Sequence, residues 1–256
     1  MKVLLAGESW ISAVTDHKGF DPFPHTQVEI GCAKLLEVLG EAGHEVHHLR
    51  SHDVAELFPQ TLEELSAYDV VLLSDIGANS LLLSPDVFTR GRPAPNRLKL
   101  LAEWVEQGGG LAMFGGYLSF QGFQAKANYH RTAVEAVLPV SISPYDDRVE
   151  TPEGIGGART AVAHPITDGL AQEWPILLGY QRLEAKDDAV VLATIEDAPL
   201  LAVREVGRGR TLAFASDVSP HWAPDEFMDW PGYAQLFDRS VRWLAGEPSI
   251  TGPSDV

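Results

Sequence analysis

The residues best suited to chemistry follow a short apolar run in the middle of the chain. The run Leu111 to Phe114 leads into Gly115-Gly116-Tyr117-Leu118-Ser119, in which two glycines precede two hydroxyl-bearing side chains. Glycine accepts positive φ and lets a ligand approach the backbone closely, so such a turn can hold side chains at the mouth of a parallel sheet. This segment, called the elbow (residues 115–119), is the first candidate site. A turn whose glycines serve packing alone is the alternative.

Further polar residues are expected on the same edge of the sheet. The apolar run Asp69 to Ser74 predicts a buried strand, and Asp75, Gly77 and Asn79 follow it directly. In open α/β sheets, ligands bind beyond the carboxyl ends of the strands. We therefore expect Asp75 and Asn79 to lie beside the two elbow glycines, all four as ligand-binding residues.

The segment from Glu8 to Gln27 is expected to be a long loop that forms a wall of the site. It mixes aromatic and ionisable side chains, among them Trp10, His17, Phe23 and His25. Loops of this length in compact domains are usually functional or disordered, and the aromatic content argues against disorder. His17 is therefore a candidate ligand-binding residue. A loop that covers an apolar surface or an oligomer contact is the alternative.

Alternating strands and helices must position these residues. Short apolar runs predict strands at Lys2–Ala6, Glu45–Leu49, Asp69–Ser74 and Leu111–Phe114. Helical spacing and capping signals predict helices at Val28–Ala42, Thr61–Ala67 and Asn96–Gln107. The alternation predicts an α/β fold with a parallel, right-handed doubly wound sheet. Adjacent His47 and His48 must point to opposite faces of their strand, so they cannot bind one metal ion together.

The local composition of the chain changes after about Leu138. Frequent prolines and glycines separate short apolar runs, which predict a β-rich part at residues 138–215. A terminal helix then begins at Pro231 and ends at Gly246, and residues 247–256 are expected to form a flexible tail.

Composition excludes several classes of protein. Apolar residues make up 45% of the chain and charged residues 21%, values typical of globular domains. The net charge of −17 opposes binding to nucleic acid and to anionic membranes. The first apolar run is too short for a signal peptide, so a cytoplasmic location is expected. The single cysteine, Cys32, excludes an intrachain disulfide framework.

Three segments together resemble the class I glutamine amidotransferase-like superfamily, and most closely its putative glutamine amidotransferase and trehalose-utilisation-like branches. They are the strand and elbow Leu111–Ser119, the segment His164-Pro165-Ile166 followed by Gly169-Leu170, and the turn Gly207–Arg210, which leads to a strand with Asp217 and His221. The resemblance covers residues 1–246 as one domain. It implies a flavodoxin-like sheet, an elbow of the form G-x-C-x-G, and a later strand followed by a histidine and an acid.

The elbow departs from that pattern at the residue that matters most. Superposition of the motif places Tyr117 in the cysteine position and Ser119 in the last glycine position. Cysteine, with a pKa of ~8.5, is partly ionised near neutral pH, whereas tyrosine at ~10 is mostly not. Cys32 is expected in the middle of a helix on its buried side, where a thiol behaves as a small hydrophobe. Glutaminase activity is therefore expected to be absent.

His221 loosely matches the superfamily's histidine, with Asp225 or Glu226 nearby as an orienting acid. As a base it could serve Tyr117 or Ser119; a structural or ligand-orienting histidine is the alternative. A divalent metal site is a third possibility, although no spacing ties its candidate ligands together: His17, His25, Asp75, Asp217 and His221. The candidate residues are thus Tyr117, Ser119 and His221 for catalysis, and His17, Asp75, Asn79, Gly115, Gly116 and Asp217 for ligand binding.

These observations favour an amidotransferase-like protein that has no thiol nucleophile and binds a small polar metabolite, such as a sugar or an amide, at the elbow. One alternative is a hydrolase that uses Ser119 or Tyr117 with His221. Another is a non-catalytic subunit of an oligomer, with aromatic segments at the contacts. No cofactor is expected. The expected partners are a small-molecule ligand and further copies of the chain, with no nucleic acid and no membrane.

Overall fold

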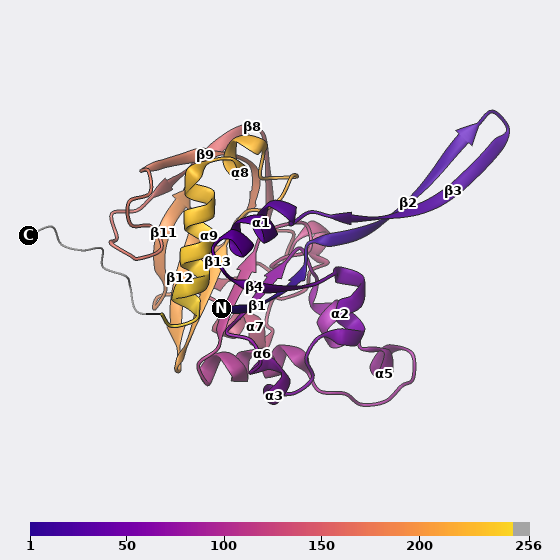
Figure 1. Cartoon of the computed structure of the whole chain (residues 1–256), viewed down its shortest axis with the longest axis horizontal. Coiled ribbons are helices and arrows are strands. Elements are labelled where there is room, and N and C mark those ends of the chain that lie inside the picture. The colour runs from indigo at the N-terminus through magenta and orange to yellow at the C-terminus, as the bar shows by residue number, and fades with distance from the viewer. Residues whose placement is uncertain (248–256) are drawn as a thin grey trace, which may run out of the picture.

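A computed structural model describes residues 1–247, and a nine-stranded sheet runs through the centre of that part (Figure 1). Five neighbouring strands are parallel, in the order β4 (Glu45–Leu49), β1 (Lys2–Gly7), β5 (Val70–Ser74), β6 (Gly110–Phe114) and β13 (Gly209–Phe214). Counted along the chain, these strands follow the flavodoxin-like order 2-1-3-4-5. The predicted strands near Val3, Val46, Val71 and Ala112, and the doubly wound sheet, are confirmed.

Antiparallel strands extend the sheet beyond β13. They are, in order, β12 (Ala198–Val206), β11 (Val190–Ile195), β8 (Arg148–Arg159) and β9 (Glu173–Gln181). A small separate sheet pairs β7 (Val140–Ser141) with β10 (Glu184–Ala185). The predicted β-rich C-terminal part is therefore confirmed, and it continues the main sheet.

Helices cover both faces of the parallel part, which explains why β5 and β6 are buried along their whole lengths. On one face, α1 (Ala33–Glu41) packs against α9 (Pro231–Leu244). On the other, α6 (Arg97–Glu106) packs against α7 (Ala133–Val137). The shorter helices are α2 (Ser51–Leu57), α3 (Leu62–Leu65), α4 (Ala78–Leu82), α5 (Pro85–Phe88), the 3-10 turn η1 (Phe123–Ala125) and α8 (Asp225–Met228).

Local signals place several of these helices correctly. The Thr61 hydroxyl accepts a hydrogen bond from the Glu64 N–H, the predicted capping box of α3. Asn96 caps α6, and Pro231 occupies the first turn of α9.

The expected loop from Glu8 to Gln27 is wrong. Residues 9–30 form a long antiparallel hairpin of β2 (Ser9–Lys18) and β3 (Asp21–Ile30), which projects from the body at the upper right of Figure 1. We call this hairpin the arm (residues 9–30). Strand β3 contains Pro22 and Pro24, and their missing N–H groups are tolerated because β3 is the edge of a two-stranded ribbon.

The expected helix Val28–Ala42 begins later than predicted, because Val28 belongs to the arm. Helix α1 starts at Ala33, and Cys32 is its N-cap residue, not a mid-helix one. Cys32 is fully buried, with its Sγ 3.5 Å from Nε2 of His48. Burial, and then the charge of Glu8, raises the pKa of this thiol to about 12. The thiol was expected to be unreactive because of a position inside a helix, whereas the structure places it buried at the N-terminus of α1.

Within residues 1–247, no helix is both long and apolar enough to cross a bilayer. The tail expected at residues 247–256 lies, from residue 248 onward, outside the described residues.

Candidate functional site

Two buried acids and one half-buried acid lie beyond the carboxyl ends of the parallel strands. Glu8 follows β1, Asp75 follows β5, and Asp217 lies three residues after β13. Glu8 and Asp217 are 1% and 3% exposed. Glu8 and Asp75 also have positive φ values of 49° and 42°, which are unfavourable for residues with a Cβ. Buried acids and backbone strain at a sheet's ligand-binding edge together point to a functional site.

A hydrogen-bonded chain connects two of these acids. The Ser219 Oγ lies 2.6 Å from Oε1 of Glu8 and 3.0 Å from Oδ1 of Asp217. A hydroxyl has one proton to donate, so one of the two contacts requires a proton on a carboxyl group. Burial, followed by the charges of Asp217 and Asp75, raises the pKa of Glu8 well above its usual range. Glu8 is therefore the protonated member: it donates to Ser219, which donates to Asp217.

Asp75, the third acid, is hydrogen-bonded to the elbow. Its Oδ1 accepts a hydrogen bond of 2.6 Å from the Leu118 N–H, and its own N–H donates to the Ser119 Oγ at 3.0 Å. A Cβ at Gly116, whose φ is 137°, would lie only 3.0 Å from the Asp75 carboxylate. Burial, and then the charge of Asp217, raises the pKa of Asp75 to about 6. The glycine thus allows the elbow backbone to close onto an acid that is partly protonated near neutral pH.

The other elbow glycine joins the site to the end of β13. The Gly115 N–H donates to the carbonyl groups of Phe214 and Ser216. The side chain of Gln181 donates to the Gly116 carbonyl and lies 3.4 Å from the Gly116 N–H, which donates to it. These contacts leave the backbone of both elbow glycines occupied by the protein itself.

Aromatic side chains line the side of the site opposite Glu8. The Tyr117 ring stacks on Phe123, with 5.5 Å between ring centroids and 8° between planes. The Arg148 guanidinium lies 4.6 Å from the Tyr117 centroid and 4.5 Å from the Phe123 centroid. The Glu150 carboxylate accepts hydrogen bonds from the Tyr117 hydroxyl and from the Trp222 indole N–H. We call Tyr117, Phe123 and Trp222 the aromatic group.

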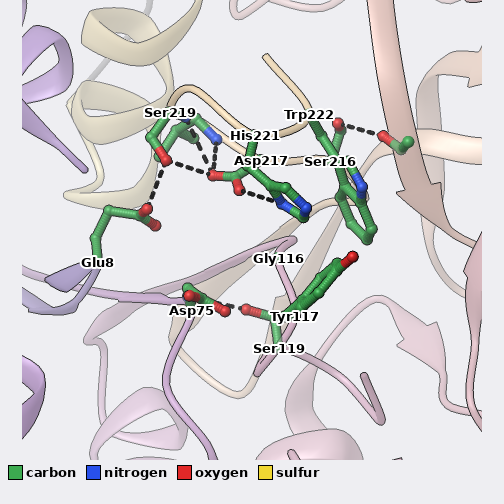
Figure 2. Close-up of polar contacts among 12 residues, drawn as sticks. Glu8, Asp75, Gly116, Tyr117, Ser119, Ser216, Asp217, Ser219, His221 and Trp222 are labelled. Carbon is green, nitrogen blue, oxygen red and sulfur yellow. Dashed lines mark hydrogen bonds and ion pairs between the residues drawn. The ribbon is translucent and has the colours of Figure 1, made fainter. Parts of the chain in front are cut away.

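His221 lies between the aromatic group and the acids. Its Nδ1 is 3.5 Å from Oδ2 of Asp217, and its ring meets Tyr117 edge to face at 4.3 Å. Figure 2 shows Glu8, Asp75, Tyr117, Asp217 and His221 arranged around one centre. The His221 side chain is 39% exposed, so this centre is deepest at Glu8 and open at His221.

The structure does not bring all the sequence-predicted residues together. His17 lies near the tip of the arm, paired with Pro22, and His25 lies beside Asp16 on the arm, at 3.6 Å. Both are remote from the strand ends because the expected loop is a projecting hairpin (Figure 1). Asn79 is exposed in the first turn of α4.

Within residues 1–247, no three His, Cys, Asp or Glu side chains are placed to hold a metal ion. The five residues considered for a metal site from the sequence are therefore not assembled into one.

Sequence reasoning missed several residues of the site. Glu8 had a usable signal, since it is an acid placed directly after the glycine that ends the first strand. Phe123 and Trp222 also had a signal, because Phe123 lies four residues after the elbow and Trp222 directly follows His221. Arg148, Glu150 and Gln181 had none, because only the tertiary fold brings these distant positions to the elbow.

Arg148 also lines a cavity of about 500 Å³, formed by residues 141–149 with Arg182 and Glu184, and here called the side cavity. Asp147 lines it as well, but its carboxylate already accepts hydrogen bonds from the N–H groups of Gln121 and Gly122. The strained backbone and the connected acids are at the strand ends, so the strand-end site remains the candidate.

The backbone after the elbow differs from a nucleophile elbow. In that motif a strand turns sharply into a helix, with the nucleophile on the turn. Here β6 is followed by η1, and the next α-helix, α7, begins only at Ala133. The unusual backbone angle belongs to Gly116, not to Tyr117. Among the described residues, Tyr117 therefore has no strained backbone, and no α-helix begins directly after it.

Comparison with known proteins gives the family. Residues 2–246 match the family model described as "Putative glutamine amidotransferase". The chain belongs to this family. No curated protein matches it.

Two solved members of similar size come from Salmonella typhimurium. The cytoplasmic proteins STM3548 and STM1381 are each 43% identical to this chain, with TM-scores of 0.91 and 0.90. Each alignment covers 95% of this chain and 99% of the other. A ThuA-like protein from Parabacteroides merdae shares the fold at 14% identity, with a TM-score of 0.59 and coverage of 99% and 93%. The family resemblance inferred from the elbow and the later motifs is therefore confirmed.

Proposed function

We propose that this amidotransferase-like protein binds a small, uncharged polar ligand with hydroxyl or amide groups at the strand-end site, without thiol chemistry. The observation that carries the proposal is the set of three acids, two buried and one half-buried, that faces the aromatic group across His221. We also propose a cytoplasmic location, as for the two Salmonella relatives.

The charges at the site select the ligand class. Burial, and then the charges of neighbouring acids, raises the pKa values of Glu8 and Asp75. An anionic ligand would add to the repulsion among these charges, and the net charge of −17 already disfavours its approach. A neutral ligand can donate hydroxyl or amide protons to Asp75 and Asp217 and place an apolar face on the aromatic group. This combination supports a polyol, a sugar or a carboxamide.

Hydrolysis of glutamine through a thioester is not supported by the side chains present. The only thiol, that of Cys32, is buried and keeps its proton. Burial, followed by Glu150, raises the pKa of Tyr117, so its phenol stays protonated and is a weak nucleophile.

The alternative of a hydrolase that uses Ser119 or Tyr117 is also weakened. Ser119 is 1% exposed and its hydroxyl is held by the Asp75 N–H, while the Tyr117 hydroxyl donates to Glu150. The pair of His221 and Asp217 keeps one catalytic candidate open, because an imidazole oriented by a carboxylate can activate a bound water.

Thermal-shift measurements with a panel of neutral and charged metabolites test the proposal. We expect monosaccharides, disaccharides or carboxamides to raise the melting temperature, and phosphates and dicarboxylates to have no effect. His221→Ala should weaken binding at least tenfold but change stability by less than about 1 kcal/mol, since the side chain is partly exposed.

Tyr145→Ala serves as the aromatic control: Tyr145 is 76% exposed at the side cavity, so this variant should leave binding unchanged. Binding of anions alone would refute the proposed ligand class. Ammonia release from glutamine that persists in Cys32→Ala, at a rate typical of enzymes, would refute the absence of amidase chemistry. A lower melting temperature of His221→Ala with unchanged binding would make His221 structural.

A further inference from the structure

The arm is an element that the proposed ligand site does not use. It consists of two ten-residue strands in register from Ser9 opposite Ile30 to Lys18 opposite Asp21, and Figure 1 shows it extending away from the body. An isolated two-stranded ribbon is at best marginally stable in water. The arm therefore needs a covering surface that the single chain does not supply.

The two faces of the arm differ in chemistry. Directly paired residues project to the same face, and successive pairs alternate between faces. Ile11 is paired with Val28, and the next pair, Ser12 with Gln27, projects to the other side. The face of Ile11 is mainly apolar and is here called the apolar face: Ile11, Ala13, Pro22, Pro24, Val28 and Ile30, with Ser9, Thr15, His17 and Thr26 among them. The opposite face mixes Trp10, Val14 and Phe23 with all the acidic residues and the lysine of the arm. Ile11, Val28 and Ile30 are 53%, 49% and 40% exposed.

The register also shows how the arm can be covered. The Gly31 N–H donates to the Glu8 carbonyl, so the pair at the root is hydrogen-bonded, and the pairs alternate from there. Pro22 and Pro24 then fall at positions whose backbone nitrogens face outward, where neither can donate to a further strand. We therefore do not expect a further strand to pair with the outer edge of β3, and we expect a partner to contact the apolar face instead.

The body presents a matching surface near the root of the arm. Leu57 at the end of α2, Leu83 after α4 and Phe88 at the end of α5 are 65%, 37% and 76% exposed. We call these three residues the body patch. The Arg97 guanidinium ties α2 to α4 by donating to carbonyl groups of both. Figure 1 shows α2 and α5 on the side of the body from which the arm projects.

The buried surface area distinguishes two arrangements of a dimer, arm packed on arm and arm packed on the partner's body. One face of a ribbon of ten residue pairs covers about 300 Å², from a rise of ~3.4 Å per residue and a width of ~10 Å. Two arms packed only on each other would bury about 600 Å² in total, which is less than stable interfaces need. Two arms each laid on the other chain's body would bury about 1,200 Å², the lower limit of that class.

Charge favours contact through the arm. Residues 9–30 hold one lysine against two aspartates and one glutamate, whereas the whole chain carries −17. Broad contact between two bodies would bring like charges together, and the arm separates them. One chain also carries both complementary surfaces, as a two-fold symmetric interface requires.

We propose that two copies of this chain form a dimer by exchanging arms, each arm laying its apolar face on the partner's body patch. The proposal does not depend on the ligand site.

Light scattering coupled to size exclusion tests this arrangement. The unmodified chain should have twice the 27.9 kDa mass of one copy at micromolar concentration. Ile11→Glu/Val28→Glu, the apolar-face variant, and Phe88→Glu, the patch variant, should each run as monomers. Ser12→Glu/Gln27→Glu adds the same charges on the opposite face of the same strands and should remain dimeric.

Mixing the variants tests the arm-to-body geometry. The apolar-face variant keeps an intact body patch, and the patch variant keeps an intact arm, so a mixture can form one of the two contacts, with about 600 Å² buried. The mixture should therefore associate only weakly, at higher concentration than the unmodified chain needs, whereas neither variant alone should associate. Equal melting temperatures of the monomeric variants would show that the body remains folded. A monomeric unmodified chain, a dimeric apolar-face variant, or an opposite-face variant that dissociates equally would overturn the proposal. A Phe88→Glu chain that stays dimeric would overturn the arm-to-body contact.

Discussion

Glu8 and Asp75 keep carboxyl groups where burial and neighbouring charge both oppose ionisation. Neither group has a cationic partner within hydrogen-bond distance among residues 1–247; their contacts are the hydroxyls of Ser74 and Ser219 and the N–H of Leu118. Both also have positive φ. Glycine adopts such backbone angles at lower cost, so an acid at either position adds backbone strain to the cost of burying a carboxyl group.

Asp75→Asn should stabilise the protein above neutral pH. The pKa of Asp75 is about 6 in the folded state, against ~3.9 when unfolded. Because the folded value is the higher one, protonation favours folding, and this contribution is complete below about pH 4 and lost as pH rises through 6. The variant should therefore gain up to about 3 kcal/mol at pH 8 and almost nothing at pH 4.

Urea unfolding at both pH values measures this difference. Asn retains an oxygen that can accept from the Leu118 N–H, so lost bonding does not confuse the comparison. Asp69→Asn is unsuitable as a control because that carboxylate accepts from the Lys2 N–H; Asp187, which is exposed, is suitable. A gain of equal size at pH 4 and pH 8 would contradict the raised pKa.

Glu8 should tolerate an amide but not truncation. If Glu8 is the protonated member of the chain with Ser219, Glu8→Gln preserves a neutral group with a donor and an acceptor and should change the free energy of unfolding by less than about 1 kcal/mol. Glu8→Ala leaves Ser74 and Ser219 without that partner and opens a cavity, so it should cost about 2 kcal/mol or more. A strong stabilisation by Gln at pH 7 would show instead that Glu8 is ionised.

At the scale of elements, one buried arginine of α6 connects this helix to α2 and α4. Arg97 is 1% exposed, and burial lowers its pKa. Its guanidinium donates to the carbonyls of Val54, Ala55 and Phe58 at the C-terminal end of α2, and to that of Leu81 in α4. It therefore satisfies the carbonyl groups that the short helix α2 leaves open at its end.

Arg97→Met should cost about 3 kcal/mol, because several buried carbonyl groups lose their donors. Arg97→Lys should recover only part of this loss, since one ammonium cannot reach α2 and α4 together as the planar guanidinium does. Arg90→Met on α5 is the control: its pair with Asp86 is exposed and should contribute less than about 1 kcal/mol. Equal effects of the Arg97 and Arg90 variants in urea unfolding would remove Arg97 from this role.

Elements whose local signal agrees with the tertiary structure were predictable. The fully apolar strands β5 and β6, the capping box at Thr61 and the proline that begins α9 all follow from short-range patterns. The arm was not predictable in this way. Its prolines at residues 22 and 24 indicate a loop unless the strand is known to be the edge of a two-stranded ribbon. The apolar residues of one face also do not stand out as every second residue in the sequence, because Trp10 and Phe23 add aromatic side chains to the opposite face.

Only the site residues that directly follow parallel strands could be predicted from the sequence. Asp75, the elbow and Asp217 all follow parallel strands, so they meet at one edge of the sheet, and His221 lies close behind. Arg148, Glu150 and Gln181 come from the antiparallel extension, whose path to the elbow no local pattern specifies. His17 was misplaced for the same reason that the arm was missed.

At the scale of the whole molecule, the extension completes the parallel sheet. Strand β12 covers the open edge of β13, and β9 carries Gln181 back to the elbow. The site is therefore enclosed by both parts of the sheet, the parallel part supplying acids and the antiparallel part supplying Arg148 and Glu150.

One residue belongs both to the root of the arm and to the acid cluster. The Glu8 N–H is tied to Ser74, its carbonyl accepts from Gly31 where the arm rejoins the body, and its side chain lies against Ser219. A Cβ at Gly31 would lie 2.6 Å from that carboxyl group. Whatever holds the arm in place therefore acts on a residue whose carboxyl group belongs to the acid cluster. Because thermodynamic coupling is reciprocal, a contact on the arm that changed the pKa of Glu8 would itself be strengthened or weakened, by the same free energy, when Glu8 gained or lost its proton.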